Sequence, residues 1–223
     1  MRSMRASPIG TYRSNASVST TVCCVIIVHA GNRIDGPCRS LPRFPQSEIE
    51  RVAVQVREFF ALLQPRAVVS APASGADLLV LTEALRADID VIVVLPVDRH
   101  SFLEMSVADG PSAGMWSARF DRVLAAAADR PNSQVVTLHL DPDSEWWFSA
   151  NDRLVEIARA ARQPPASDVT VGFESVAALV IRPLPLTDPR SVTDDLAAKA
   201  AAADMVVFTI DPRPQVERTI SLQ

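Results

Sequence analysis

The residues best suited to chemistry lie in two short turns that contain glycine. The first is Ser70–Asp77, of sequence SAPASGAD, which follows a short apolar run and opens an apolar-periodic segment. The second is His29–Arg33, of sequence HAGNR, which ends another apolar run. The first N–H groups of a helix lack intrahelical partners and lie at the positive end of its dipole, so small residues there let a phosphate approach. The sequence therefore predicts that the backbone at Ser74–Ala76 binds a phosphate group.

Polar side chains in the same turns extend this predicted site. The guanidinium of Arg33 can clamp a phosphate bidentately, and Asp77 or Asn32 can read a sugar hydroxyl or a base amine. In an enzyme, Asp77, Asp35 or His29 would be the acid or base, and the sequence does not choose among them. The candidate binding residues are Gly31, Asn32, Arg33, Asp35, Ser70, Ala73, Ser74, Gly75, Ala76, Asp77 and Arg99.

These candidates also have purely structural interpretations. Ser74 and Gly75 are typical of helix capping and of close packing between a helix and a strand. Asp77 stands at capping-box spacing from Ser74. Arg33 and Arg99 are compatible with solvated charges or surface ion pairs. The residue types alone leave both interpretations open.

The two turns must be positioned by apolar runs that alternate with helical patterns. The predicted strands are Val22–Val28, Arg66–Ser70, Asp90–Pro96, Gln134–Leu138, Val176–Ile181 and Met205–Ile210. The predicted helices begin at a capping box of Ser47 and Glu50 and at one of Ser74 and Asp77, and then cover Asp98–Ala108, Met115–Ala128, Ser144–Arg162 and Ser191–Ala203.

Strands that alternate with helices imply right-handed crossovers and a sheet covered on both faces. The sequence thus predicts an α/β fold, a Rossmann-like three-layer sandwich with a mainly parallel sheet of about six strands. It predicts one domain over residues 21–212, a disordered N-terminal extension over 1–20 and a C-terminal tail over 213–223. Ligands of such sheets bind outside the carboxyl ends of the strands, near the switch point, where both turns would lie.

Two further segments are informative within this framework. The loop from Gly31 to Gln46 is long and rich in Pro and Arg, and long ordered loops at strand ends are often functional. In the helix predicted over 144–162, Trp147 falls on the core face, and for Trp146 the core is favoured over a pocket or a partner surface. A polar connection, Gln163–Gly172, follows.

The amino-acid composition argues against several classes of function. The 223 residues are 48% hydrophobic and 22% charged, with a net charge of −4, so a nucleic-acid partner is not expected unless arginines gather on one face. Three cysteines, Cys23, Cys24 and Cys38, form neither a disulfide framework nor a metal-ligand spacing, which favours the cytoplasm. No run is long enough to span a bilayer. A polar segment separates the basic start from the first apolar run, which argues against a signal peptide.

The two turns together resemble the superfamily that joins the DNA-processing protein A fold to the Lonely guy cytokinin-activating enzymes, often called SLOG domains. Gly31 and Arg33 match its first motif, and Ser70, Ala73, Gly75 and Asp77 match its second. The segments VVLP at 93–96, RF at 119–120 and SVT at 191–193 resemble an uncharacterised bacterial branch found beside signalling modules. The resemblance spans roughly residues 22–212.

The resemblance implies a domain that binds a nucleotide or a nucleotide derivative, for sensing or signalling. The PGGxGTxxE signature of the Lonely guy phosphoribohydrolases is absent, so the phosphate loop and the glutamate of that hydrolysis are missing. A nucleotide-processing enzyme is the alternative hypothesis, and single-stranded DNA binding is the third. No cofactor, metal or membrane partner is expected, and a homo-oligomer is left open.

Overall fold

The computed structural model describes residues 25–37, 39–141, 145–162, 175–184 and 191–214. The predicted N-terminal extension, Cys23, Cys24, Cys38, the Gln163–Gly172 connection and nearly all of the predicted C-terminal tail lie outside these residues. Within them, six strands form one sheet in the order β4-β3-β2-β1-β5-β6. Every neighbouring pair is parallel. The predicted α/β, Rossmann-like class is confirmed.

The strands are β1 Val25–Gly31, β2 Ala67–Ser70, β3 Asp90–Leu95, β4 Gln134–Thr137, β5 Ser175–Ile181 and β6 Val206–Ile210. The α-helices are α1 Ile49–Leu63, α2 Ala76–Arg86, α3 Arg99–Ser106, α4 Ala113–Asp129, α5 Trp146–Ala160 and α6 Val192–Ala202, and a short 3-10 helix, η1, covers Gln46–Glu48. Except at the first strand, these bounds lie within a few residues of the predicted ones.

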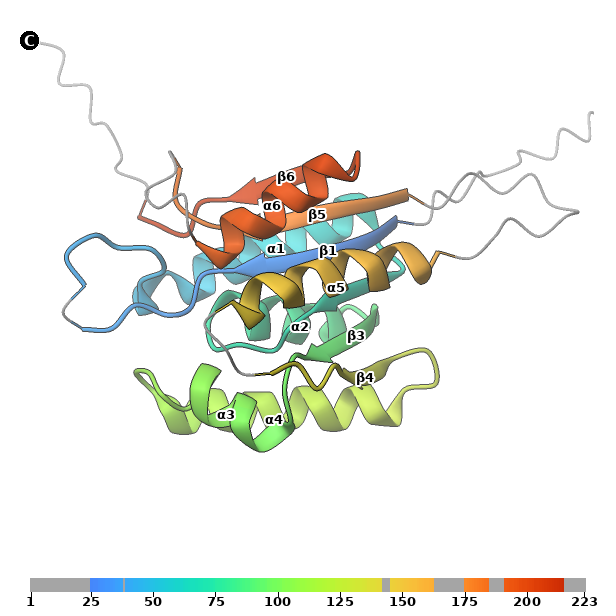
Figure 1. The fold of residues 1–223 in the computed structure, drawn as a ribbon. Coiled ribbons are helices and arrows are strands. Elements are labelled where there is room, and N and C mark those ends of the chain that lie inside the picture. The colour runs from blue at the N-terminus through green and yellow to red at the C-terminus, as the bar shows by residue number, and fades with distance from the viewer. Residues whose placement is uncertain (1–24, 38, 142–144, 163–174, 185–190, 215–223) are drawn as a thin grey trace, which may run out of the picture.

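Helices cover both faces of the sheet, as Figure 1 shows. Successive side chains of a strand point to opposite faces, so each strand contributes to two separate cores. Ile27 and Ile181 belong to the core beneath α1, α2 and α4. Ile26 and Val180 belong to the core beneath α5 and α6. The three-layer arrangement follows from strands that are apolar on both faces.

The chain changes direction across the sheet between β1 and β5. From β1 the strands progress to β2, β3 and β4, and then the chain crosses back through α5 to pair β5 with the free side of β1. The loops that follow β1 and β5 therefore diverge at this position. Such a switch point leaves a crevice at the carboxyl ends of the strands, where ligands of open α/β sheets bind.

Two local predictions are wrong. The first strand extends beyond Val28 to Gly31, so His29 and Ala30 are strand residues and not part of a turn. Ser47 caps no helix, because η1 precedes α1 and places the serine inside a helical turn. Trp146 is 5% exposed and belongs to the core, whereas Trp147 is only partly buried. Trp146 is thus a core residue, as favoured from the sequence, and Trp147 stacks on it and packs against the same core.

Candidate functional site

The two predicted turns contact each other at the carboxyl ends of β1 and β2. Gly75 has a φ of 98°, and a Cβ atom there would lie 2.7 Å from the Ile34 nitrogen and 2.8 Å from the Asn32 oxygen. A Cβ atom at Gly31 would overlap that of Ala76. Both glycines therefore permit the backbone of residues 31–34 to lie directly against the start of α2.

The predicted phosphate cradle at Ser74–Ala76 already has partners within the protein. The N–H of Ala76 donates to the Asn32 carbonyl at 3.1 Å, and the N–H of Ser74 donates to the Ser106 carbonyl at 2.9 Å. The predicted Ser74–Asp77 capping box is wrong, because the N-cap residue of α2 is Gly75 and no side chain caps it. The loop after β1 thus occupies the start of α2, where the sequence predicts a bound phosphate.

Asp77 instead links α2 to β1. Its Oδ1 accepts from the Gly31 N–H at 2.7 Å and lies 3.3 Å from Nε2 of His29. His29 is fully buried, and its Nδ1 lies 2.8 Å from the Leu179 carbonyl oxygen. A carbonyl only accepts, so Nδ1 carries a proton and donates it. Nε2 of His29 and the Asp77 carboxyl group therefore attract each other only when a proton lies between them.

Burial dominates the ionisation of Asp77. It raises the pKa of this carboxyl group, while His29 and the N–H groups of Gly31 and Ala73 act in the opposite direction. The carboxyl is enclosed between a strand, a buried imidazole and the first turn of α2, which gives it a structural role beneath the candidate site.

Arg33 connects three segments at the edge of the site. Its Nε donates to the Ser74 hydroxyl at 3.3 Å, and its guanidinium is paired with Asp109 in the loop between α3 and α4. The side chain remains 40% exposed. An anion that reaches Arg33 must therefore share this guanidinium with Asp109.

Asp35 shapes the loop that follows β1. Its Oδ2 accepts from the backbone N–H groups of Arg43 and Phe44 at 2.8 and 2.9 Å, and its own N–H donates to the Phe44 carbonyl. Oδ1 lies 3.5 Å from Nε of Arg39. Since Phe44 is fully buried, these bonds close the loop and hold its arginines near the end of β1.

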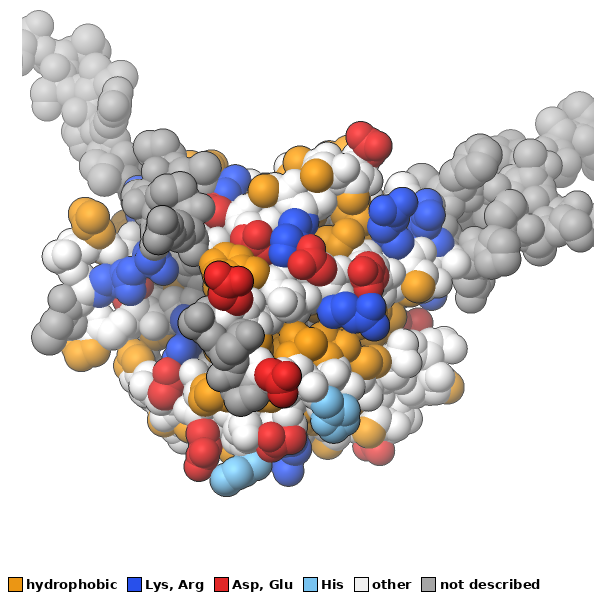
Figure 2. All heavy atoms as spheres, in the orientation of Figure 1, with side chains coloured by type: hydrophobic (Ala, Val, Ile, Leu, Met, Phe, Trp, Pro, Cys, Tyr) orange, Lys and Arg blue, Asp and Glu red, His pale blue; other side chains and the backbone are white. Residues whose placement is uncertain are grey.

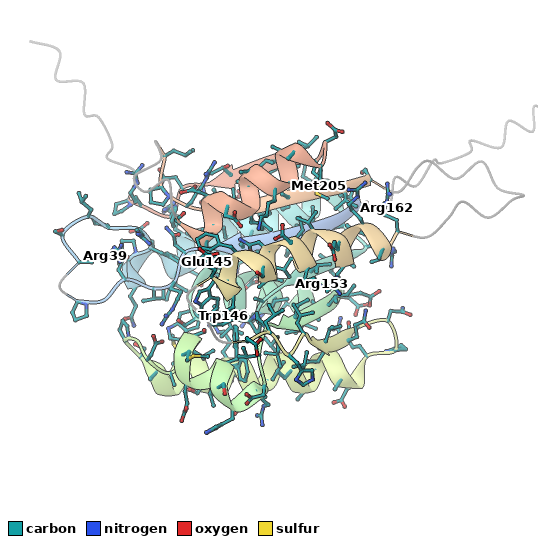
Figure 3. The ribbon with its side chains drawn as sticks, viewed as in Figure 1. Arg39, Glu145, Trp146, Arg153, Arg162 and Met205 are labelled. Carbon is teal, nitrogen blue, oxygen red and sulfur yellow. The ribbon has the colours of Figure 1, made fainter. Side chains whose placement is uncertain are left out.

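A pocket of about 400 Å³ lies where this loop faces the start of α6. Its cationic side chains are Arg33, Arg39 and Arg43, and its remaining lining residues are Gly31, Asn32, Ile34, Ser191, Val192 and Thr193. Basic side chains gather on the loop that leaves β1 (Figure 2), and Arg39 projects from that loop in Figure 3. The pocket occupies the switch point between β1 and β5.

Asn32 joins the two walls of this pocket. Its Oδ1 accepts from the Thr193 hydroxyl at 3.3 Å, and its backbone N–H donates to the Ile181 carbonyl at 2.9 Å. Within the described part of the chain, the side-chain NH₂ of Asn32 has no hydrogen-bond partner. This donor is available at the pocket wall.

The other predicted candidates do not line the pocket. Ser70 is fully buried and donates to the Ala71 carbonyl, and Ala73 is buried in the turn before α2. Arg99 lies on α3, where it pairs with Asp121 at 2.7 Å and lies over the Phe120 ring. For Arg99 the geometry matches the surface ion-pair interpretation.

Sequence reasoning missed six residues of the pocket wall, Ile34, Arg39, Arg43, Ser191, Val192 and Thr193. Arg39 and Arg43 carried a signal, because they stand in the long arginine-rich loop after the first strand. Ser191 was predicted as a helix cap, and the segment Ser191–Thr193 carried a signal only as part of the resemblance to the bacterial branch. This segment lies about 160 positions further along the chain, and only the β1–β5 pairing brings it alongside.

Two kinds of feature are absent from the described residues. No group of three or more His, Cys, Asp or Glu side chains could hold a metal ion there. None of the helices in those ranges is both long and apolar enough to cross a membrane.

The fold is similar to that of a solved protein. Over 87% of its length the chain matches the X-ray structure of DNA processing protein A (DprA) from Streptococcus pneumoniae, with a TM-score of 0.50 and 15% sequence identity. The match covers 52% of that protein, so the chain spans about half its length. Identity this low establishes similarity of fold alone. No protein-family model matches the chain, and no curated protein does.

Proposed function

We propose that this protein binds a nucleotide or a nucleotide-derived ligand in the pocket at the carboxyl ends of β1 and β5. One observation carries the proposal: three arginines of one loop, Arg33, Arg39 and Arg43, line a pocket at the topological switch point. Guanidinium groups match the oxygens of a phosphate bidentately, and switch points are where open α/β sheets bind ligands.

The contacts of each pocket residue within the protein indicate its role in binding. The start of α2 is occupied by the Asn32 carbonyl, so the arginines bind the phosphate and the helix amides do not. Arg39 contributes an exposed cation: its Nε donates to the Leu41 carbonyl at 3.2 Å and lies 3.5 Å from Asp35, and its side chain is 40% exposed. The NH₂ group of Asn32 donates to a sugar or base acceptor. Asp35 supports the site by holding the loop closed.

We also propose that the protein belongs to the SLOG superfamily and that it acts in sensing or signalling. Binding without catalysis agrees with the position of the acidic groups. Asp77 is enclosed beneath Gly31, and Asp35 accepts two backbone N–H groups. Neither carboxyl lines the pocket as an exposed acid or base. Release of a free base or ribose phosphate from a bound nucleotide would contradict this assignment and favour the enzyme alternative.

A thermal-shift screen tests the proposal. The probes are nucleoside mono- and diphosphates, nicotinamide dinucleotides and cyclic nucleotides. A ligand at a hundred times its Kd adds roughly 2.7 kcal/mol to the free energy of unfolding, which is a measurable rise in Tm. We expect at least one probe to stabilise the protein and Arg39→Gln to abolish that effect.

The matched control is Arg153→Gln. This exposed arginine lies on α5, away from the loop (Figure 3), and its replacement removes the same charge. The control is expected to retain the full ligand-induced shift. Failure of every nucleotide to raise the Tm of the wild-type protein would overturn the proposal, as would equal losses in both variants.

A further inference from the structure

A second group of arginines lies between α2 and α4, away from the pocket described above. These helices pack against each other on one face of the sheet. A groove of about 410 Å³ between them is lined by Arg86, Arg119, Arg122 and Arg130. The other lining residues are Thr82, Leu85, Val123 and Ala126, so no acidic side chain lines the groove. No residue lines both this groove and the pocket beside β1.

Two of the four arginines are held by the protein itself. Arg86 pairs with Glu83 at 2.7 Å, and Arg130 donates to the Leu85 carbonyl at 2.8 Å and lies 3.3 Å from Asp88. They come from the last turn of α2 and from the end of α4. These contacts fix two guanidinium groups at the groove in a defined geometry.

Arg119 and Arg122 have no carboxylate partner among the residues that the structure describes. Arg119 lies over the Trp116 ring, with 4.9 Å between its guanidinium carbon and the ring centre. Its Nη1 is buried and, within the same described ranges, has no hydrogen-bond partner. A buried guanidinium nitrogen without an acceptor lowers the free energy of unfolding. A bound ligand would supply the acceptor that Nη1 of Arg119 lacks.

The charges around Arg119 reinforce this interpretation of the groove. Burial, followed by repulsion from Arg86 and Arg122, lowers the pKa of the Arg119 guanidinium, and the buried Glu83 only partly offsets these effects. The α5–α6 face differs, because its basic and acidic side chains alternate in Figure 2 and Lys199 lies within 3.1 Å of both Asp152 and Asp195. In the described part of the chain, Arg119 and Arg122 thus lack a carboxylate partner, whereas Lys199 on the other face has two.

We infer that the α2–α4 groove binds an anion made of linked phosphoryl groups, with Arg119 and Arg122 as its principal contacts. A guanidinium stacked on an indole ring is already oriented, and its planar fork matches phosphoryl oxygens. The groove is larger than one phosphate group needs and presents several cations, which favours two or more linked phosphates. Free pyrophosphate and polyphosphate carry phosphoryl groups joined directly through oxygen, and a nucleic-acid backbone carries phosphodiester groups joined through its sugars.

Titration calorimetry with inorganic pyrophosphate tests the inference on the full chain. We expect the wild-type protein to bind pyrophosphate and Arg119→Gln/Arg122→Gln to bind it at least tenfold more weakly, because charge-assisted hydrogen bonds are lost. Arg153→Gln/Arg159→Gln on α5 removes the same charge and should retain the wild-type affinity. Since Arg119 is half-buried, the single exposed substitution Arg122→Glu is measured as well, and circular dichroism verifies that each variant folds.

A loop variant separates this inference from the proposed nucleotide site. Arg39→Gln removes a cation of the proposed nucleotide pocket, so any pyrophosphate bound beside β1 is lost, whereas the binding that depends on Arg119 and Arg122 should remain. If Arg39→Gln abolishes binding and the α4 variants do not, the anion binds beside β1 and the inference fails. It also fails if the wild-type protein does not bind pyrophosphate, or if the α5 control loses as much affinity as the α4 variants.

A fluorescent single-stranded oligonucleotide identifies the source of the phosphates. If the groove binds nucleic acid, the oligonucleotide competes with pyrophosphate, and its affinity falls with salt by about 0.7 log units per log unit for each phosphate contact. If the groove binds free phosphate chains, pyrophosphate still binds and the oligonucleotide does not displace it. Either result supports phosphate binding in the α2–α4 groove, and the two results assign different ligands to it.

Discussion

At the residue scale, the glycines of the two predicted turns, Gly31 and Gly75, are required for close packing of the backbone. Gly75 has a positive φ and faces the backbone of residues 32–34, so it lets two loops meet. Asp77 shows the same tendency, because its carboxyl accepts a backbone N–H of β1 and faces a buried histidine. The residues that we propose to bind the ligand are the arginines of the loop after β1.

Gly75→Ala tests the packing role of this glycine. The new Cβ would lie within 3 Å of three backbone atoms and would hold an L-residue at φ 98°, so we expect a loss of about 1–3 kcal/mol in the free energy of unfolding. Gly114→Ala is the matched control, because Gly114 lies in α4 and a Cβ atom there would have no neighbour within 4 Å. That helical substitution should stabilise the protein by about 0.5–1 kcal/mol. Urea denaturation measures both, and equal effects would refute the packing role.

Asp77→Asn tests the buried carboxyl through its pH dependence. The pKa of Asp77 is raised in the folded protein, so between the unfolded value of 3.8 and the folded value the native state holds a proton that the unfolded state has lost. This group's contribution to stability therefore falls as the pH rises through that window. We expect the stability of wild type relative to Asp77→Asn to decrease there, measured by urea denaturation from pH 4 upward. A difference that does not change with pH would contradict the raised pKa.

At the scale of elements, helix starts show where a sequence motif misleads. Ser47 and Ser191 each stand three residues before an acidic side chain, and both patterns predict a capping serine. Only Ser191 caps, accepting from the Asp194 N–H at 3.1 Å. Ser47 lies within η1, because the chain enters α1 through a 3-10 turn after Pro45.

Paired substitutions separate these two serines. Ser191→Ala should destabilise the protein by about 0.5–2 kcal/mol, as loss of an N-cap does. Ser47→Ala should change the free energy of unfolding by less than about 0.5 kcal/mol, as surface substitutions usually do. Chemical denaturation of the two variants provides the measurement. A larger loss for Ser47→Ala than for Ser191→Ala would show that the capping assignment is wrong.

At the scale of the whole molecule, the sheet separates two cores that hardly share side chains. Ile181 of β5 belongs to the core beneath α1, α2 and α4, and Ile92 of β3 belongs to the core beneath α5 and α6. Two strands, β1 and β2, lie between β3 and β5. Substitutions at the two isoleucines should therefore act independently.

A double-mutant cycle tests this independence. Ile92→Val and Ile181→Val should each cost about 0.5–1.5 kcal/mol in the free energy of unfolding, as removal of one buried methylene group does. The double variant should equal their sum within about 0.5 kcal/mol. A coupling energy well above that value, measured by equilibrium urea denaturation, would mean that the two cores respond as one.

The sequence by itself determined the fold class, the alternation of strands and helices, and the sheet edge at which two glycine turns meet. Local periodicity carries this information, because a strand apolar on both faces requires helices on both sides. Only the tertiary structure decided which residues line the pocket. Pairing of β5 with β1 brings Thr193 beside Asn32, and the Asn32 carbonyl occupies the helix start that was predicted to bind phosphate. These contacts join segments far apart in the chain, and no local pattern encodes them.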